Sequence, residues 1–206
     1  MSKRPLDEDQ VVAVAARLAD SDGLDSLTLT SVARELGVQQ PALYRHVESF
    51  DGLVRSLGLL GRGVLADSLG AAAIGVSRDD AVKAVGLAWR KVVREHPGIY
   101  AATDRYPCAG DNELEQAVER IVAILGQSLA GYRLDDDQRV HAARTLRSAF
   151  HGFAHLEAGD GHPLSQDLDD SFHQMIQLIC AGIQSMEAGS DTTPNQSNRQ
   201  PQETLT

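Results

Sequence analysis

Aromatic residues, cysteines and long apolar runs are scarce in this sequence. Only 4% of its 206 residues are aromatic, and its two cysteines, Cys108 and Cys180, are too few and too far apart for a disulfide framework. We expect one loop thiol and one small buried apolar side chain. Because no apolar run approaches the length that crosses a bilayer, we expect no membrane partner.

Sequence motifs of catalysis and secretion are also missing. The chain has no glycine-rich phosphate loop, no Gly-x-Ser-x-Gly elbow, and no secretion signal at its start. We therefore predict no enzyme, no catalytic residues, no cofactor and a cytoplasmic location. Two alternatives stay open at this point, a small-molecule enzyme and a helical adaptor that uses the same fold for protein contacts.

Strand-like alternation of polar and apolar residues is absent over any convincing length, whereas helical spacing recurs almost throughout. The sequence therefore predicts an all-α fold. We expect three parts: a helix-turn-helix DNA-binding domain over 1–50, a helical ligand-binding and dimerisation domain over 51–188, and a disordered tail over 189–206, where Ser, Thr, Asn, Gln and Pro dominate.

The N-terminal pattern predicts three short helices that cross closely. A first helix is expected from about Leu6 to Asp22, closed by Gly23. Thr28 or Thr30 offers the hydroxyl that begins a second helix. Its inward face consists of small and aliphatic residues, so it packs tightly against its neighbours: Val32, Ala33 and Leu36.

A turn and a third helix follow. Gly37 lies where the chain must adopt left-handed dihedrals, and Pro41 fits the first turn of a new helix of about seven residues. That helix buries Leu43 and Val47. Its other residues are suited to base edges and phosphates: Gln39, Gln40, Ala42, Tyr44, Arg45 and His46. This arrangement is typical of a helix-turn-helix that reads double-stranded DNA.

The charge balance restricts how the chain binds DNA. The net charge is −10, and residues 1–50 contain five Lys/Arg against eight Asp/Glu. Since bulk attraction is absent, binding must depend on locally placed groups, including Lys3 and Arg4 on an N-terminal arm. The full set of expected DNA contacts is Lys3, Arg4, Thr28, Thr30, Gln39, Gln40, Ala42, Tyr44, Arg45 and His46.

The segment LTLTSVARELGVQQPALYRHV resembles the three-helix DNA-binding module of the tetracycline-repressor (TetR) family of bacterial transcription factors. The combination of Gly37, Val38 and the run Ala-Leu-Tyr-Arg-His-Val carries this resemblance. It implies a regulator that binds a palindromic operator as a homodimer. One position departs from the family pattern, because Phe50 stands where relatives often carry a phosphate-binding lysine.

Beyond the third helix the pattern predicts five helices and a single turn. The expected bounds are 49–73, 78–95, a short turn over 99–103, a loop over 104–111, and helices over 113–130, 135–157 and 169–187. The last helix carries more apolar surface than one neighbour covers. We expect the last two helices of each subunit to form a four-helix dimer interface, which the family resemblance also implies, through Ala142, Leu146, Ala149, Phe172, Met175, Ile176, Ile179 and Ile183. The alternative is that this stripe is internal core.

The few aromatic residues gather in the second half of the chain, where they are expected to line a cavity for a small-molecule effector. The candidates are Trp89, Tyr100, Tyr106, Phe150, His151, Phe153 and His155. The segment RSAFHGFAHLE resembles a C-terminal type of the family that carries a tryptophan and a His-Gly pair. A hydrogen-bonded core histidine is the alternative for His151. His151 and His155 have the spacing of two helix-borne metal ligands, but no third ligand is evident, so no metal site is predicted.

Overall fold

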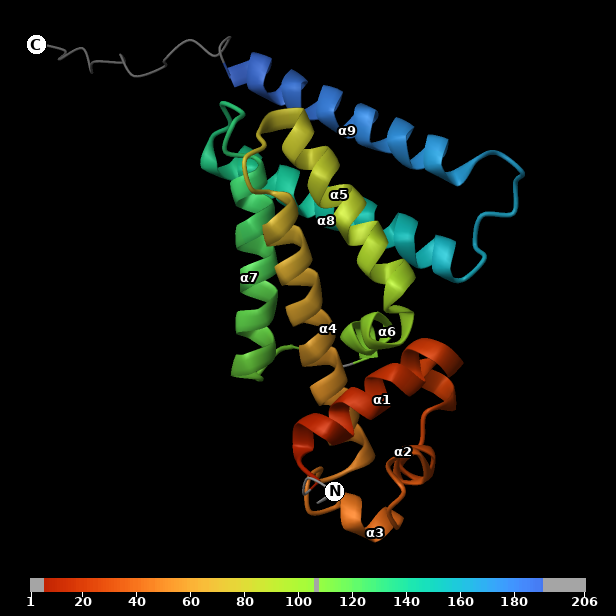
Figure 1. Ribbon diagram of the computed structural model, residues 1–206. Helices are drawn as coiled ribbons and strands as arrows, with labels where there is room; N and C mark the ends of the chain where they lie inside the picture. The colour runs from red at the N-terminus through yellow and green to blue at the C-terminus, as the bar shows by residue number, and fades with distance from the viewer. Residues whose placement is uncertain (1–5, 106–107, 191–206) are drawn as a thin grey trace, which may run out of the picture.

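The computed structural model describes residues 6–105 and 108–190, and within these ranges every regular element is a helix (Figure 1). The predicted all-α class is confirmed. None of the helices in the described part of the chain combines the length and apolarity that a bilayer crossing requires.

Three α-helices form a small N-terminal unit. They are α1 (Glu8–Asp22), α2 (Leu29–Leu36) and α3 (Gln40–Leu43), with a 3-10 turn, η1 (Leu24–Ser26), between the first two. Asp7 begins α1 by accepting a hydrogen bond from the backbone N–H of Gln10 at 2.8 Å. Gly23 ends it with φ at 84°, a left-handed region that glycine adopts at little cost.

Helix α4 (Phe50–Ala72) connects this unit to the rest of the molecule, as Figure 1 shows. Ser49 caps it by accepting from the N–H of Gly52 at 2.9 Å. Its first turns contribute Leu53, Val54 and Leu57 to the hydrophobic core of the N-terminal unit. Its second half joins the core of the body. The N-terminal core therefore extends past residue 50 along this helix.

The body consists of five further helices: α5 (Arg78–Glu95), α6 (Pro97–Arg105), α7 (Asn112–Ser128), α8 (Asp136–Ala158) and α9 (Leu168–Ser190). The expected short turn over 99–103 is wrong, because α6 has nine residues. Proline is tolerated at the start of a helix, so the breaker that ends α5 also begins α6. The expected tail began too early, since Gly189 and Ser190 belong to α9. The rest of that expectation, residues 191–206, lies outside the described residues.

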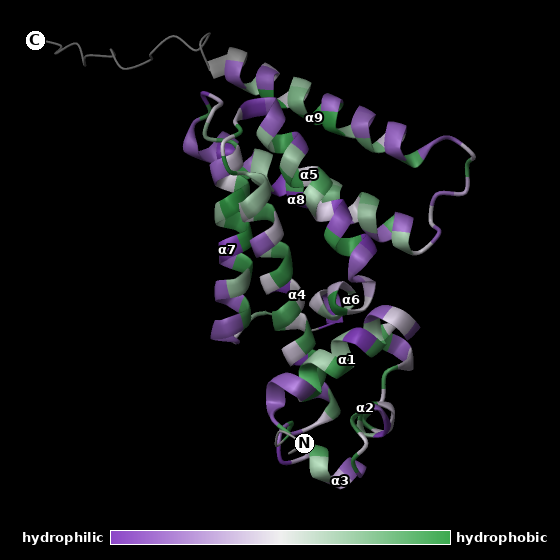
Figure 2. Cartoon of the chain, in the orientation of Figure 1, coloured by the Kyte–Doolittle hydropathy of each residue, from purple (hydrophilic) through white to green (hydrophobic). Residues whose placement is uncertain are grey.

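Large apolar side chains of α5, α8 and α9 meet in the centre of the body. Trp89 packs against Phe150 with ring centroids 6.3 Å apart, and Phe150 packs against Phe172 at 6.2 Å. Both phenylalanines are fully buried. Gly86 lets the Phe150 ring approach, because a Cβ at that position would lie 2.8 Å from the ring. Figure 2 shows that α9 carries hydrophilic and hydrophobic residues side by side along its length.

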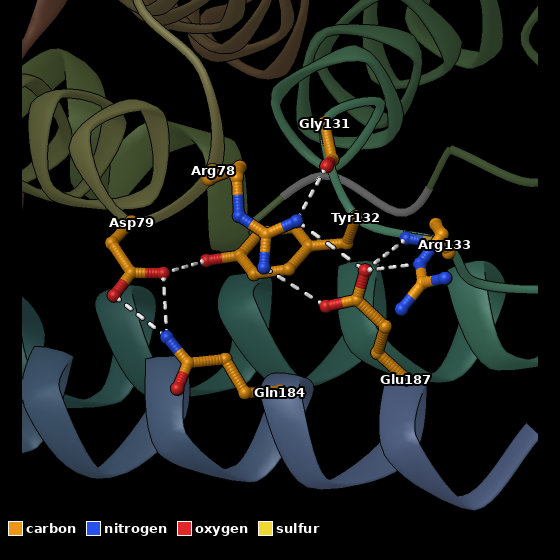
Figure 3. Close-up of polar contacts among 7 residues, drawn as sticks. All are labelled: Arg78, Asp79, Gly131, Tyr132, Arg133, Gln184 and Glu187. Atoms are coloured by element: carbon orange, nitrogen blue, oxygen red, sulfur yellow. Dashed lines mark hydrogen bonds and ion pairs between the residues drawn. The ribbon is translucent and has the colours of Figure 1, made fainter. Parts of the chain in front are cut away.

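A buried glutamate fixes the C-terminal part of α9 to the body (Figure 3). The Glu187 carboxylate accepts from Arg78 Nη2 at 2.9 Å and from the backbone N–H of Arg133 at 2.9 Å. Next to it, Asp79 accepts from the Tyr132 hydroxyl at 2.6 Å and from the Gln184 amide at 2.9 Å. The network joins the start of α5, the loop before α8 and the last helix.

The two cysteines lie as expected. Cys180 is buried in the body core on α9, and Cys108 is half-buried in the segment that precedes α7. Neither forms a disulfide.

Candidate nucleic-acid interface and body cavity

The turn between α2 and α3 is built by local signals. The Thr28 hydroxyl accepts from the N–H of Ser31 at 3.0 Å, and the Ser31 hydroxyl lies 3.1 Å from the N–H of Thr28, a reciprocal cap. Gly37 adopts φ 68° and ψ 34°, the left-handed conformation predicted for it. The N–H of Val38 then bonds to the carbonyl of Ala33 at 3.0 Å, which closes the helix end. This fixes the angle at which α3 leaves α2.

The third helix is shorter than the seven residues expected, since only Gln40–Leu43 is α-helical. Tyr44, Arg45 and His46 form a turn, in which the N–H groups of His46 and Val47 both bond to the carbonyl of Leu43, at 2.8 and 3.0 Å. The physical reason is the early start of α4, whose cap at Ser49 requires the chain to change direction within a few residues.

The side chains predicted to meet DNA lie together on the outer face of α2, α3 and this turn. Tyr44 is 53% exposed, so its ring and hydroxyl are accessible to a partner. Thr28, Thr30, Gln39 and Arg45 are exposed, and Gln40, Ala42 and His46 are half-buried. Beneath them Leu43 and Val47 are buried, as predicted. Lys3 and Arg4 lie outside the described residues.

Two of the predicted contact residues are hydrogen-bonded to one another. The Thr30 hydroxyl donates to the Gln40 side-chain carbonyl oxygen at 2.9 Å. The bond holds the Gln40 amide at the N-terminal end of α3, where side chains of a recognition helix reach base edges. Sequence spacing alone did not indicate this pairing.

Arg55, which follows the turn on α4, forms ion pairs with two carboxylates. Its guanidinium lies 2.6 Å from Asp111 and 2.6 Å from Glu113, near the start of α7. The Arg55 guanidinium, mainly by hydrogen bonding, lowers the pKa of Asp111 to about 2. The partners are more than fifty residues apart, so no local pattern indicated the pair.

Helix α6 joins the body to the N-terminal unit through an unusual cap. The Asp20 carboxylate of α1 accepts from the backbone N–H groups of Gly98 and Ile99 at 2.8 and 3.0 Å, and lies 3.0 Å from His96 Nδ1. These are the N–H groups that a helix start leaves without an internal partner. A Cβ on Gly98 would lie 2.1 Å from the Ala19 backbone, so the two helices touch. Any displacement of α6 therefore acts directly on α1.

The other side of α6 packs against α4 through glycines. A Cβ on Gly61 would lie 2.5 Å from the carbonyl oxygen of Ile99, and one on Gly58 would lie 3.0 Å from that of Ala102. In a helix interior, glycine lowers the intrinsic helix propensity relative to alanine. The role of Gly58 and Gly61 here is to allow the close approach of two backbones.

A small cavity lies where α4, α5, α6, α7 and α8 meet. Its volume is about 60 Å³, and its wall includes three of the predicted ligand residues, Trp89, Tyr100 and His151, together with Arg62 and Arg147. Trp89 Nε1 donates to the Tyr100 hydroxyl at 2.9 Å, and that hydroxyl lies 2.7 Å from His151 Nδ1. Burial raises the pKa of Tyr100 well above its usual value, so its hydroxyl remains protonated. His151 is hydrogen-bonded, but its side chain is 38% exposed, so it does not belong to the buried core.

Three other predicted ligand residues do not line this cavity. Phe150 lies within the core between Trp89 and Phe172. Phe153 packs edge-on against Phe172 at 4.9 Å, on the side that faces α9. His155 is exposed one turn beyond His151. Tyr106 lies outside the described residues. Neighbouring residues of an α-helix point in different directions, so Phe150, His151 and Phe153 lie on different faces of α8 and the aromatic cluster of the sequence divides in space.

The outer side of α8 and α9 forms an open apolar groove of about 900 Å³. Ala149, Met175 and Ile179 line it and are half-buried, and Leu178 beside them is 74% exposed. Ala142 and Ile183, also on its wall, are almost fully covered within the chain. Leu146, Phe172 and Ile176 lie in the body core, as do Ala142 and Ile183, which agrees with the alternative of internal core for these residues. Leu178, which the prediction omitted, is the most exposed large apolar residue on this face.

Comparison with known proteins agrees with this arrangement. Residues 11–57 match the family model described as bacterial regulatory proteins of the tetR family. Residues 82–179 match the tetracyclin repressor-like C-terminal domain. An uncharacterised HTH-type transcriptional regulator of Mycobacterium tuberculosis is 34% identical over 180 residues, which cover 87% of this chain and 82% of that protein.

Solved structures share the fold. A TetR transcriptional regulator of Streptomyces coelicolor superposes with a TM-score of 0.69 at 21% identity, covering 89% of this chain and 100% of that one. A TetR variant of Acinetobacter baumannii in complex with minocycline superposes with a TM-score of 0.65 at 23% identity, covering 89% of this chain and 99% of that one. The chain thus belongs to the TetR family of bacterial transcriptional regulators.

Proposed function

We propose that this regulator is a cytoplasmic repressor that acts without catalysis, binds a palindromic operator as a homodimer, and is released by a small-molecule effector. The observation that carries the proposal is the exposed face around α3, where Gln39 precedes the helix and Tyr44 and Arg45 lie in the turn that follows it. Gly37 fixes the direction of this helix. Because the chain carries a net charge of −10, these few groups must supply the attraction to DNA that the rest of the surface opposes.

A dimer follows from the size of that face. One α3 with its turn reaches only a few base pairs, each worth about 1–3 kcal/mol of discrimination for a good bidentate contact. Two copies related by a twofold axis read two half-sites. The apolar groove on α8 and α9 supports this assembly, since Leu178 and Met175 would be covered by the same helices of a second copy.

The cavity beside Trp89, Tyr100 and His151 is the proposed effector site. Its wall combines apolar side chains, Leu65, Val118 and Ile121, with polar groups that could orient a bound molecule. A related TetR protein binds minocycline, a drug-sized ligand. Such ligands occupy roughly 300 Å³ or more. A cavity of about 60 Å³ must therefore expand before one enters.

Expansion of the cavity would be transmitted through α6. Tyr100 lies on α6 and takes part in the cavity wall, while the first N–H groups of the same helix are held by Asp20 of α1. An effector that displaces Tyr100 thus shifts α1 and the attached α3. Coupling of about 1–3 kcal/mol changes operator affinity roughly 5- to 150-fold.

Selection of bound DNA from a random pool tests the function. The full chain, at low salt and without effector, should enrich a palindrome whose half-sites are spaced by about one helical turn or a multiple of it. A chain that enriches no sequence over random competitor would exclude a sequence-specific regulator and favour the adaptor or enzyme alternatives.

A further inference from the structure

Three side chains with metal-binding atoms converge at the mouth of the cavity. Asp104 comes from α6, and His151 and His155 come from successive turns of α8. One ligand atom of each lies within 4.8 Å of the corresponding atoms of the other two. The sequence-based prediction rejected a metal site because a third ligand was missing, and the fold places Asp104 in that position.

The orientation of His151 suits it for coordination. Its Nδ1 lies 2.7 Å from the Tyr100 hydroxyl, which leaves Nε2 directed toward Asp104 at 3.9 Å. Histidines that bind metals usually have the other ring nitrogen held by a hydrogen bond in this way. Metal binding requires the lone pair of Nε2, so Nδ1 would carry the ring proton and donate it to the Tyr100 oxygen. The His155 ring stacks on His151 with centroids 5.7 Å apart.

We propose that Asp104, His151 and His155 form a site for a divalent transition-metal ion, with zinc as the preferred occupant. Two imidazoles and one carboxylate suit Zn²⁺, which binds such ligands at about 2.0–2.2 Å. All three side chains are at least partly exposed, so small rotamer changes bring the ligand atoms together without moving the backbone. The three residues leave a coordination position open for water or an effector atom.

Nearby positive charge lowers the expected affinity, because Arg62 and Arg147 both line the same cavity. Arg147 lies one helical turn before His151 and takes part in the same cavity wall. Its guanidinium repels a cation, but its exposed side chain can turn toward solvent. The site is therefore expected to be weaker than a closed structural zinc site.

The metal would connect the two helices on either side of the cavity. Asp104 lies near the C-terminal end of α6, and the N-terminal end of α6 is held by Asp20. A bound ion would fix α6 to α8 and thereby bias the position of α1. This regulatory consequence rests on the proposed function, whereas the metal site itself does not.

Titration of the purified full chain with Zn²⁺, and with Co²⁺ as a spectroscopic probe, tests the site. We expect one ion per chain and cobalt absorption bands typical of nitrogen and oxygen ligands. His155→Ala and Asp104→Asn should each weaken zinc binding about 10-fold or more, since each removes one of three ligands. His141→Ala is the matched control, because it removes an exposed histidine of the same helix outside the cluster.

The outcomes separate the two parts of the inference. Zinc binding that is equal in the wild-type chain and in His155→Ala, or that is lost in His141→Ala, would overturn the site. If the site holds, adding Zn²⁺ should change operator affinity in the wild-type chain about 5-fold or more and leave His155→Ala unchanged. A zinc-loaded chain with unaltered operator affinity would refute the regulatory consequence. Failure to select any operator would refute the proposed function and leave the metal result standing.

Discussion

Gln40 shows how one side chain sets the sequence preference of the proposed DNA contact. Its amide is held by the Thr30 hydroxyl at the N-terminal end of α3. We expect Gln40→Ala to relax the preference at one base position of each half-site. The binding free energy for the preferred base should weaken by about 1–3 kcal/mol. Selection from a random pool measures this, and an unchanged sequence profile would contradict the assignment.

Tyr44→Phe is the companion variant for that experiment. If the exposed Tyr44 hydroxyl meets a phosphate, its removal weakens binding to all sequences alike and leaves the base preference intact. The two variants thus separate a base contact from a backbone contact on the same surface.

Gly37 is the residue on which the direction of α3 depends. At φ 68° a β-branched side chain is strained, so Gly37→Val should lower the free energy of unfolding by about 1–3 kcal/mol. Gly37→Asn is the control, because asparagine tolerates the left-handed region better than other residues. Urea unfolding of both variants measures the difference. Equal unfolding midpoints for Gly37→Val and Gly37→Asn would argue against backbone strain.

Residue-level features were predictable where their cause is local in sequence. The cap at Thr28 and the turn at Gly37 each depend on residues within three or four positions, and both are confirmed. The Asp20 cap on α6 and the Arg55 ion pairs depend on residues more than fifty positions apart, and no pattern indicated them.

At the scale of the elements, α4 and α6 pack closely against one another, and glycine makes this contact possible. We expect Gly61→Ala to force the two helices apart and lower the free energy of unfolding by about 1–3 kcal/mol, even though alanine favours helix formation. Gly63→Ala is the matched control two residues away, where a Cβ would meet no atom within 4 Å. That variant should be neutral or stabilised by up to about 1 kcal/mol.

Thermal and urea unfolding of the two alanine variants decide whether packing or propensity dominates in α4. We expect the free energy of unfolding to fall in Gly61→Ala and to stay the same or rise in Gly63→Ala. Stabilisation in both would mean that helix propensity outweighs the contact between α4 and α6.

Helix bounds were predictable to within a few residues wherever the apolar stripe was long, as in α5, α8 and α9. The two errors occur in short elements. Helix α3 was drawn too long because the start of α4, a tertiary constraint, ends it early. Helix α6 was read as a turn because its opening proline resembles a stop signal when only the sequence is considered.

At the scale of the whole molecule, the exposed groove on α8 and α9 predicts the oligomeric state. Leu178→Arg should place a charge at its centre and yield a monomer at micromolar concentration, with weaker operator binding as a consequence. Leu164→Arg is the control, because Leu164 is 76% exposed, close to the 74% of Leu178, but lies in the loop between these helices. Sedimentation analysis measures both masses, and a dimer of Leu178→Arg would place the interface elsewhere.

The attachment of α9 predicts how stability responds to acid. Hydrogen bonds from Arg78 and from the Arg133 backbone lower the pKa of Glu187 from 4.5 to about 2. Because the folded chain favours the charged form, this contribution is complete above about pH 4.5 and disappears as the pH falls toward 2. The pKa of Asp111 is also lowered, from 3.8 to about 2, so its contribution to stability is likewise lost as the pH falls through this range.

Glu187→Gln tests this attachment. The variant should be less stable than the wild-type chain at pH 7, and the difference should shrink between pH 4.5 and 2 because the wild-type carboxylate then becomes protonated. Urea midpoints across this range measure the effect, with Glu119→Gln, an exposed glutamate of α7, as control. A pH-independent difference would mean that shape, and not charge, makes Glu187 important.

The division of the fold into two hydrophobic cores could be anticipated from the sequence, but not the way the cores share helices. Leu57 of α4 and Ile99 of α6 both belong to the N-terminal core, although each was assigned to the body by its place in the chain. Membership in a core depends on which helix a face meets, and a stripe of apolar residues does not identify its partner.

The Asp20 cap has a consequence for chimaeras built from relatives of this protein. Grafting a foreign N-terminal unit onto this body would leave the amides of Gly98 and Ile99 without an acceptor unless the donor sequence also offers a carboxylate there. Exchange of operator preference between such proteins is therefore expected to succeed only when the last turn of α1 travels with the residues it caps.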